Sequence, residues 1–185
     1  MQENYLYSVK KQFEYYKLLG EKTFAQLNEK ELFEVSNEHS NSIAIIVNHL
    51  QGNMKSRWTG FLISDGEKEW RNRDLEFESV IKTKEELITK WDQGWECLFA
   101  ALNSVNNSNF NTEVYIRNQG HSIVEAVNRQ MMHYAYHIGQ IVYIGKMLKN
   151  SNWKSISVPK GKSGEFNNYK ISKGKHKGHF TDDFK

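Results

Sequence analysis

The feature that most constrains the fold is a helical repeat of apolar residues in four long stretches of the chain. In each stretch, large apolar side chains recur at steps of three and four residues, which is the spacing of one face of an α-helix. The chain has a single proline, Pro159, so no proline breaks these stretches. The repeats predict four helices over about residues 4–27, 42–62, 83–103 and 122–149.

Start signals support two of these helices. Thr83 is followed three residues later by Glu86, and Ser122 is followed three residues later by Glu125. This spacing is the capping box, in which the two side chains satisfy free backbone N–H groups of the first turn. We therefore expect the third and fourth helices to begin directly after Thr83 and Ser122.

The connections between the helices show no strong strand pattern. Residues 28–41 are predicted to pack locally. Residues 69–82 are predicted to form a long loop with a short helical piece, and its apolar anchors are Trp70, Leu75, Phe77, Val80 and Ile81. Residues 112–117 alternate polar and apolar side chains, which predicts a brief extended piece. Four helices without a sheet predict an all-α fold, best described as a four-helix bundle.

The helical repeat stops after residue 150, which divides the chain into a bundle over residues 1–150 and a tail over residues 151–185. The tail is rich in Lys, Gly, Ser and Asn, so we expect an irregular, partly disordered segment. From residue 150 on, eight lysines face three acidic residues, and the rest of the chain has a net charge of −2. A mildly acidic body favours a solvated tail over a nucleic-acid partner, and Lys160–Lys162 is a candidate to cover the mouth of the bundle.

Cysteine content and hydropathy predict the compartment. A single cysteine, Cys97, excludes an internal disulfide and fits a reducing environment. The N-terminal residues lack the pattern of a signal peptide, and no apolar run is long enough to cross a membrane. We expect a soluble, cytoplasmic protein without a membrane partner. Cys97 and the tryptophans, Trp70 included, are interpreted as packing residues of the core or an interface.

Two histidines mark the fourth helix as a candidate metal site. His133 and His137 lie four residues apart, about 40° around the helix axis, so their rings project side by side at the rim of the apolar stripe. Tyr134 and Ala135 follow His133, so the Glu of the H-E-x-x-H motif is missing and zincin-type hydrolysis is not supported. In the alternative, one ring packs with a hydrogen bond and the other lies at the surface.

A third histidine, His49, lies at the rim of the apolar face of the second helix. Three imidazoles from two helices are typical of a catalytic zinc site whose fourth position is open. Zinc is the first choice of divalent ion, and nickel is the second because it accepts the same donors. Among the other histidines, His39 is interpreted as solvated and His121 as the residue that precedes the helix cap Ser122. His176 and His179 are interpreted as tail residues without a metal role.

Four further residues are candidates around this site. Arg57 is expected to bind a substrate carboxylate or phosphate, or else to pair with a structural carboxylate, which is the favoured reading. Asn53 either orients a ligand or makes a polar contact between helices. Gln140 and Tyr136 are candidates to fix the tautomer of a ligating histidine.

Two segments carry a resemblance to a known family. They are Ser42–Val47, which leads into His49, and His133–Gln140. Both resemble the DinB/YfiT-like superfamily of bacterial metal-binding bundles, and the likeness covers about residues 4–150 and extends to Ser157–Ser163. Three further segments are similar to an uncharacterised Bacillus-type branch of that superfamily: Tyr5–Phe13, Gly52–Trp58 and Asp65–Lys68.

The resemblance implies a four-helix bundle with one crossover connection and a three-histidine metal site at His49, His133 and His137. Some members of the superfamily are thiol S-transferases that use a metal to activate a small thiol such as bacillithiol, others are isomerases, and many have no assigned activity. We therefore expect a metal-dependent enzyme that acts on a small molecule, either a transferase or a hydrolase-like enzyme, and a homodimer. The alternative is a non-catalytic metal-binding module that serves in stress or in protein interaction.

Overall fold

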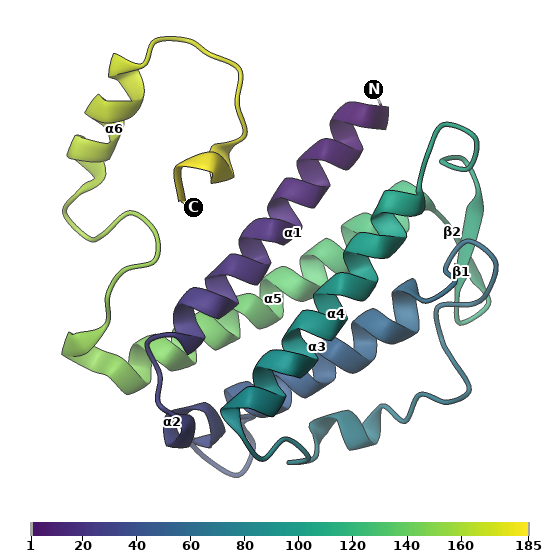
Figure 1. Cartoon of the computed structure of the whole chain (residues 1–185), viewed down its shortest axis with the longest axis horizontal. Coiled ribbons are helices and arrows are strands. Elements are labelled where there is room, and N and C mark those ends of the chain that lie inside the picture. The colour runs from purple at the N-terminus through teal and green to yellow at the C-terminus, as the bar shows by residue number, and fades with distance from the viewer. Residues whose placement is uncertain (1, 185) are drawn as a thin grey trace.

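The computed structural model describes residues 2–184, which form a mostly helical fold with one small two-stranded sheet (Figure 1). None of the described helices combines the length and the apolar character that crossing a membrane requires. The elements, in chain order, are α1 Gln2–Phe24, α2 Glu29–Phe33, α3 Ile43–Trp58, η1 Asp74–Phe77, α4 Lys84–Ser104, β1 Glu113–Ile116, β2 Gln119–Ser122, α5 Ile123–Lys149, η2 Asn150–Asn152, α6 Ser163–Ser172 and η3 Phe180–Phe184, where η marks a 3₁₀ helix.

The four predicted long helices are present as α1, α3, α4 and α5. Both predicted capping boxes are confirmed, at Thr83 and Glu86 for α4 and at Ser122 and Glu125 for α5. The second helix ends at Trp58, four residues earlier than predicted, because Gly60 takes a left-handed φ of 58° that turns the chain. The connection over residues 28–41 contains a short helix, α2, that the sequence analysis did not predict.

Helices α3 and α4 run parallel to each other. The side chain of Asn48 meets Lys90 at 2.9 Å, and that of Gln51 meets Gln93 at 3.3 Å, so residue numbers rise together along both helices. Two consecutive parallel helices need a connection that travels back along their whole length. Residues 59–83 make this return beside α3, and Figure 1 shows it as the long loop that carries η1.

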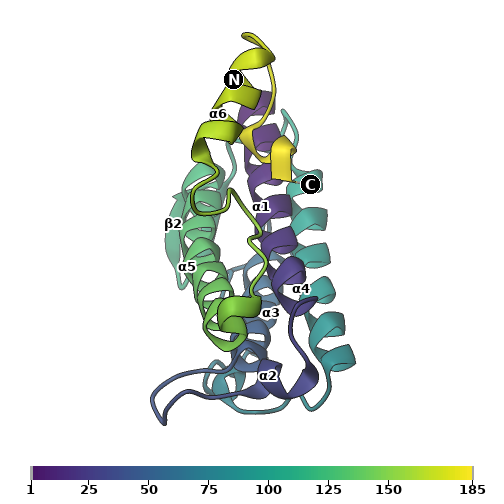
Figure 2. The ribbon, with the colours of Figure 1, turned by 90° about the vertical axis from the view of Figure 1, so that its left-hand side faces the viewer.

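Helix α1 runs parallel to α5 and antiparallel to α4. The Tyr5 hydroxyl donates to the carbonyl of Val124 at 3.2 Å, which joins the first turns of α1 and α5. At the other end of α1, Lys84 of α4 donates to the carbonyl of Phe24 at 2.8 Å. Figure 2 shows the four long helices lying side by side along one axis.

Large aromatic rings fill the space between the long helices. Phe13, Trp95 and Tyr134 are fully buried and pack against one another. The Tyr134 hydroxyl accepts a hydrogen bond from Trp58 Nε1 at 3.0 Å and donates to Asn53 Oδ1 at 3.1 Å. Because its polar end is satisfied, Tyr134 can be buried completely, and it fixes α5 against α3.

The predicted extended piece at residues 112–117 is one strand of a hairpin. Strand β1 pairs with β2, and the turn residues Arg117 and Asn118 both have left-handed φ angles, 56° and 58°. The carboxylate of Asp65 accepts hydrogen bonds from both of their backbone N–H groups, at 2.8 and 2.7 Å. The hairpin is therefore attached to the loop that follows α3.

The loop before α4 contains the predicted short helical piece, η1, but Trp70 is not an apolar anchor. Its side chain is 60% exposed, and that of Leu75 is 55% exposed. Of the predicted anchors, Ile81 is buried at 2% exposure, and the loop is also held by Glu76, a charged residue at 6% exposure. The prediction was wrong for Trp70 and Leu75, because a charged side chain takes a buried position that an apolar one was expected to fill.

The tail is more ordered than predicted. It contains α6, which Figure 1 shows standing away from the long helices, and η3, which returns to α1. Phe184 packs on Tyr15 with 5.5 Å between the ring centroids, and Lys11 pairs with Asp182 at 3.2 Å. The prediction of a loop or disordered segment failed because a short helix with no buried residue has little apolar periodicity.

Candidate metal centre

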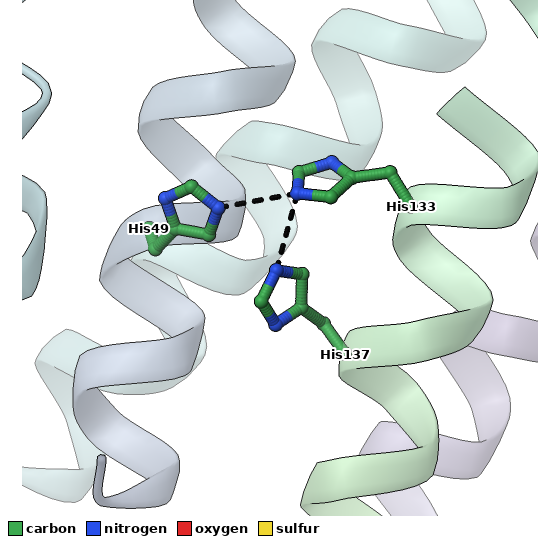
Figure 3. Close-up of side chains that lie close together, drawn as sticks. All are labelled: His49, His133 and His137. Atoms are coloured by element: carbon green, nitrogen blue, oxygen red, sulfur yellow. Dashed lines mark hydrogen bonds between the residues drawn. The ribbon is translucent and has the colours of Figure 1, made fainter. Parts of the chain in front are cut away.

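Three histidines from two helices meet at one point. His49 of α3 and His137 of α5 are buried, and His133 of α5 is half-buried. The Nε2 atom of His133 lies 3.3 Å from that of His49 and 3.1 Å from that of His137 (Figure 3). All three candidate ligand atoms lie within 4.8 Å of one another. The structure therefore brings together the three residues that the sequence analysis singled out.

Two of the rings have their outer nitrogen held by an acceptor. His49 Nδ1 lies 2.9 Å from Glu76 Oε2, and His137 Nδ1 lies 2.8 Å from Gln140 Oε1. A carboxylate and an amide oxygen only accept hydrogen bonds, so each Nδ1 carries the proton and each Nε2 keeps its lone pair. This is the tautomer and orientation that a metal-ligating histidine needs, and Gln140 was expected in this role.

Glu76 is itself held in place by several contacts. Arg71 donates to its carboxylate through Nε at 2.7 Å and Nη2 at 2.9 Å, and Asn48 Nδ2 donates to its backbone carbonyl at 2.9 Å. A Cβ on Gly52 would lie 2.4 Å from Glu76 Oε1, so only glycine leaves room for the carboxylate there. Burial raises the pKa of Glu76, but the hydrogen bonds from His49 and Arg71 lower it by more. The net result is a pKa below the ordinary value of a glutamate.

Burial keeps two of the rings neutral. It lowers the pKa of His133 from 6.5 to about 3, and the positive charge of neighbouring histidines and arginines adds to this effect. Burial also lowers the pKa of His137 to about 4, although its hydrogen bond to Gln140 opposes the shift. Neutral imidazole is the form that binds metal, so the donor set fits a divalent ion.

A cavity of about 250 Å³ lies beside the cluster, and His49, Asn53, Arg57 and His133 form part of its wall. In the described part of the chain, no cysteine, carboxylate or fourth histidine joins the cluster as a further ligand. The three donors therefore leave one side free towards the cavity. No residue beyond His133 lines it, so Lys160–Lys162 does not cover this opening as the sequence analysis considered.

The four further candidate residues all lie close to the histidine cluster or its cavity, but they make different contacts. Asn53 makes a polar contact between helices by accepting from Tyr134, and it also lines the cavity. Arg57 donates to the carbonyl of Gly66 and to Glu67, the latter at 3.3 Å, which is the structural pairing that we favoured. Tyr136 is 64% exposed and contacts the His137 ring edge-on, while Gln140 takes the ring nitrogen.

The other histidines and Cys97 lie outside the cluster, and His121 and His179 are half-buried and not solvated. The His39 side chain is 86% exposed, and His121 lies in β2 against Arg129 at 3.3 Å. His179 lies in the tail, 3.4 Å from Ser8 of α1. Cys97 is half-buried on α4 and lines a separate cavity.

Sequence reasoning missed Glu76 and Arg71. Both lie in the loop over residues 69–82, where several charged residues stand close together and no spacing rule distinguishes them. One signal was available, because Phe77 is a large apolar residue in a charged segment. Its ring stacks on His49 with 4.6 Å between centroids, so it fixes the position of its neighbour Glu76.

Fold and site together define a mostly helical protein with a three-histidine cluster that could bind a divalent metal ion. A family model described as "Protein of unknown function (DUF1572)" matches residues 1–162, and the chain belongs to this family. No curated protein and no solved structure matches the chain. The three histidines, Glu76 and the cavity all lie within the matched residues.

Proposed function

We propose that His49, His133 and His137 hold one divalent ion and that the protein is a metal-dependent enzyme. Zinc is the first choice and nickel the second, because both accept neutral imidazole nitrogen. The observation that carries the proposal is the meeting of three Nε2 atoms at the wall of a cavity, with no fourth protein ligand in the cluster.

The residues of this chain have separate roles in the proposed site. The bound ion supplies one function, lowering the pKa of a thiol or a water that reaches it. Glu76 and Gln140 hold two of the rings in the ligating tautomer. Asn53 and Arg57 stand in the cavity wall, where they would contact the substrate, and Tyr134 holds Asn53 in place.

The proposed reaction is thiol S-transfer with a low-molecular-weight thiol of the bacillithiol type. The thiol loses its proton to solvent, its sulfur forms a bond to an electrophilic carbon, and the leaving group departs with the bonding electrons. The resemblance of His133–Gln140 to the DinB/YfiT-like superfamily supports this choice. The reaction needs no protein nucleophile, and we expect it in the cytoplasm, where small thiols stay reduced.

We assign the fold to the DinB/YfiT-like superfamily, as a four-helix bundle over residues 1–150 with a separate tail over residues 151–185. The parallel run of α3 and α4 supports this assignment, because residues 59–83 then form the crossover that the resemblance implies. The family match also supports it, since it covers the four long helices and only the first part of the tail.

A homodimer remains our proposal for the assembly. Large apolar side chains lie exposed on one face of α5, which supports an interface there: Met132, Tyr136, Tyr143 and Met147. Light scattering after size exclusion should give twice the mass of the chain for the wild type. A Tyr143→Glu variant should give the mass of one chain, and two monomeric preparations would remove the proposal.

The test of the reaction is the consumption of bacillithiol with a panel of electrophiles. We expect the zinc-loaded or nickel-loaded protein to accelerate at least one reaction, and the His133→Ala variant to lose the acceleration. His39→Ala, which alters an exposed histidine, is the matched control. If the protein binds metal but accelerates no reaction in the panel, the non-catalytic metal-binding module becomes the better account.

A further inference from the structure

All the arginines of the chain line one cavity. The sequence contains five, at positions 57, 71, 73, 117 and 129, and each of them is part of the wall beside His49 and His133. They come from α3, the loop before α4, the turn of the hairpin and α5. The lysines are far more numerous, yet none lines this cavity. The wall of this cavity is therefore distinguished by guanidinium groups and not by positive charge alone.

The cavity has more positive charge than its carboxylates can neutralise. Glu67 pairs with Arg57 at 3.3 Å and with Arg117 at 2.9 Å, and Glu76 pairs with Arg71 at 2.7 Å. Five guanidinium groups and two carboxylates leave a surplus of three positive charges. This surplus is notable because residues 1–149 as a whole have a net charge of −2.

Two of the arginines have no structural carboxylate to explain them. Arg73 stacks over the Phe77 ring at 5.1 Å, and Arg129 contacts His121 at 3.3 Å. Within residues 2–184, neither guanidinium lies within ion-pair distance of an acidic side chain. Arg57, Arg71 and Arg117 can be explained as supports of the loop and the hairpin, but Arg73 and Arg129 cannot.

Each of the two buried arginines also has one N–H donor that makes no hydrogen bond. Arg57 Nε and Arg71 Nη1 are buried without a hydrogen-bond partner, although Arg71 Nη1 lies 3.7 Å from Glu67 Oε1. The two side chains are only 6% and 2% exposed. A buried donor without a partner is costly, so it is normally satisfied by a bound group. The guanidinium fork matches the paired oxygens of a carboxylate or a phosphate.

We propose that this cavity binds a small dianion, either a phosphate ester or a dicarboxylate, beside the histidine cluster. Arg73 and Arg129 would attract and hold the anionic group, and the free donors of Arg57 and Arg71 would complete its hydrogen bonds. Only the role of this anion as a substrate rests on the proposed function. Its binding follows from the charge and the donors of the cavity.

Calorimetric titration of the full-length protein tests the proposal, with inorganic phosphate and malonate as dianions and acetate as a monoanion. The titrations use protein as purified and protein freed of metal with a chelator, so that anion binding is measured apart from metal binding. Arg73→Gln and Arg129→Gln are the variants of choice, because neither removes a carboxylate pair that the fold needs. Lys30→Gln changes the same charge at an exposed position of α2 and is the matched control.

We expect saturable binding of phosphate or malonate by metal-free protein, and weaker binding of acetate. Each arginine variant should raise the Kd about tenfold or more, and Lys30→Gln less than twofold, because a charge-assisted hydrogen bond contributes that much. Arg129→Lys should recover only part of the affinity, since lysine lacks the fork. The dianion that binds more tightly identifies the chemistry, and either identity supports the proposal.

Two results would overturn it. One is the absence of saturable binding of both dianions by the wild type, and the other is an equal Kd for the wild type and both arginine variants. The outcome is separable from that of the metal site. Protein that binds phosphate but no metal would refute the proposed function and leave this inference intact, whereas protein that binds metal but neither dianion would refute this inference alone.

Discussion

The protein places its positive charge in two regions that differ in kind. From residue 150 on, the tail has eight lysines, which lie mostly on exposed positions where water and salt screen them. The cavity beside the histidine cluster has five arginines, two of them almost completely buried. A count of charges along the sequence suggests the tail as the place where an anion would bind. The burial and the type of the charged residues suggest the cavity instead.

The two regions are also supported differently. The end of the tail rests on α1 through aromatic rings and exposed ion pairs, which contribute little to stability one by one. The cavity wall is held by buried charge pairs, above all Arg71 with Glu76. Removing one partner of such a pair lowers stability strongly, because the other charge stays buried without a partner. Substitutions that break these buried pairs should therefore lower stability strongly, and changes in the tail should lower it little.

The largest effect on stability is expected for Arg71→Gln. It leaves the Glu76 carboxylate buried without its bidentate partner, so the free energy of unfolding should fall by about 3 kcal/mol in urea titrations. Arg73→Gln, two residues further on and exposed, should change it by less than about 0.5 kcal/mol. Equal losses of stability would contradict the distinction between arginines that pair with a buried carboxylate, such as Arg71, and arginines without a carboxylate partner, such as Arg73.

Glu76→Gln should weaken metal binding by about 10- to 100-fold, because the partner of His49 Nδ1 loses its charge. Competition with a chelating dye measures this affinity. Glu78→Gln, an exposed neighbour in the same loop, is the control and should leave the affinity unchanged. If the two variants bind metal equally well, Glu76 does not position His49 as a ligand.

The metal-free protein should lose stability as the pH falls from 7 to 5. His133 and His137 have a pKa of about 3 and about 4 in the folded chain, against an ordinary value of 6.5. In this window the unfolded chain takes up protons that the folded chain does not, so acid favours unfolding, by roughly 1 kcal/mol for each ring after solvent screening. Urea midpoints measure the loss.

The His133→Ala variant provides the matching control for this pH dependence. It removes one of the two rings whose pKa is lowered, so its urea midpoint should change less between pH 7 and pH 5 than that of the wild type. A wild-type midpoint that stays constant over this window would contradict the neutral state of both rings.

The smallest effects are expected for removal of residues 163–185. No tail residue lines the cavity, so metal content and the Kd for phosphate should stay within about twofold of the wild type, while stability falls by roughly 1 kcal/mol or less. Metal analysis, calorimetry and urea titration measure the three quantities. Loss of metal or of anion binding in the shortened chain would mean that the tail belongs to the site.

Local patterns in the sequence were enough to predict the long helices and the histidine cluster. Capping boxes depend on two residues three positions apart, and His133 and His137 lie one turn apart on a single helix. His49 required one further step, because its helix had to pack against theirs. The place of His49 at the rim of an apolar helix face suggested that step, and the resemblance at Ser42–Val47 and His133–Gln140 supported it.

The remaining parts of the site depend on contacts between distant segments. Glu67 and Glu76 look alike in the sequence, and only the space left by Gly52 and the position of η1 select Glu76 as the partner of His49. The hairpin was missed because its turn, Arg117 and Asn118, lacks the usual Asn-Gly pair. The meeting of five arginines has no local signature at all.

Metal analysis of the purified protein tests the central claim most directly. After exposure to zinc and desalting, the wild type and the His39→Ala control should each retain about one ion per chain, and His49→Ala and His133→Ala should retain less than about a tenth of that. Far-UV circular dichroism should report folded protein in all four samples. Equal metal content in the wild type and both site variants, or no metal in any of them, would contradict a three-histidine metal centre.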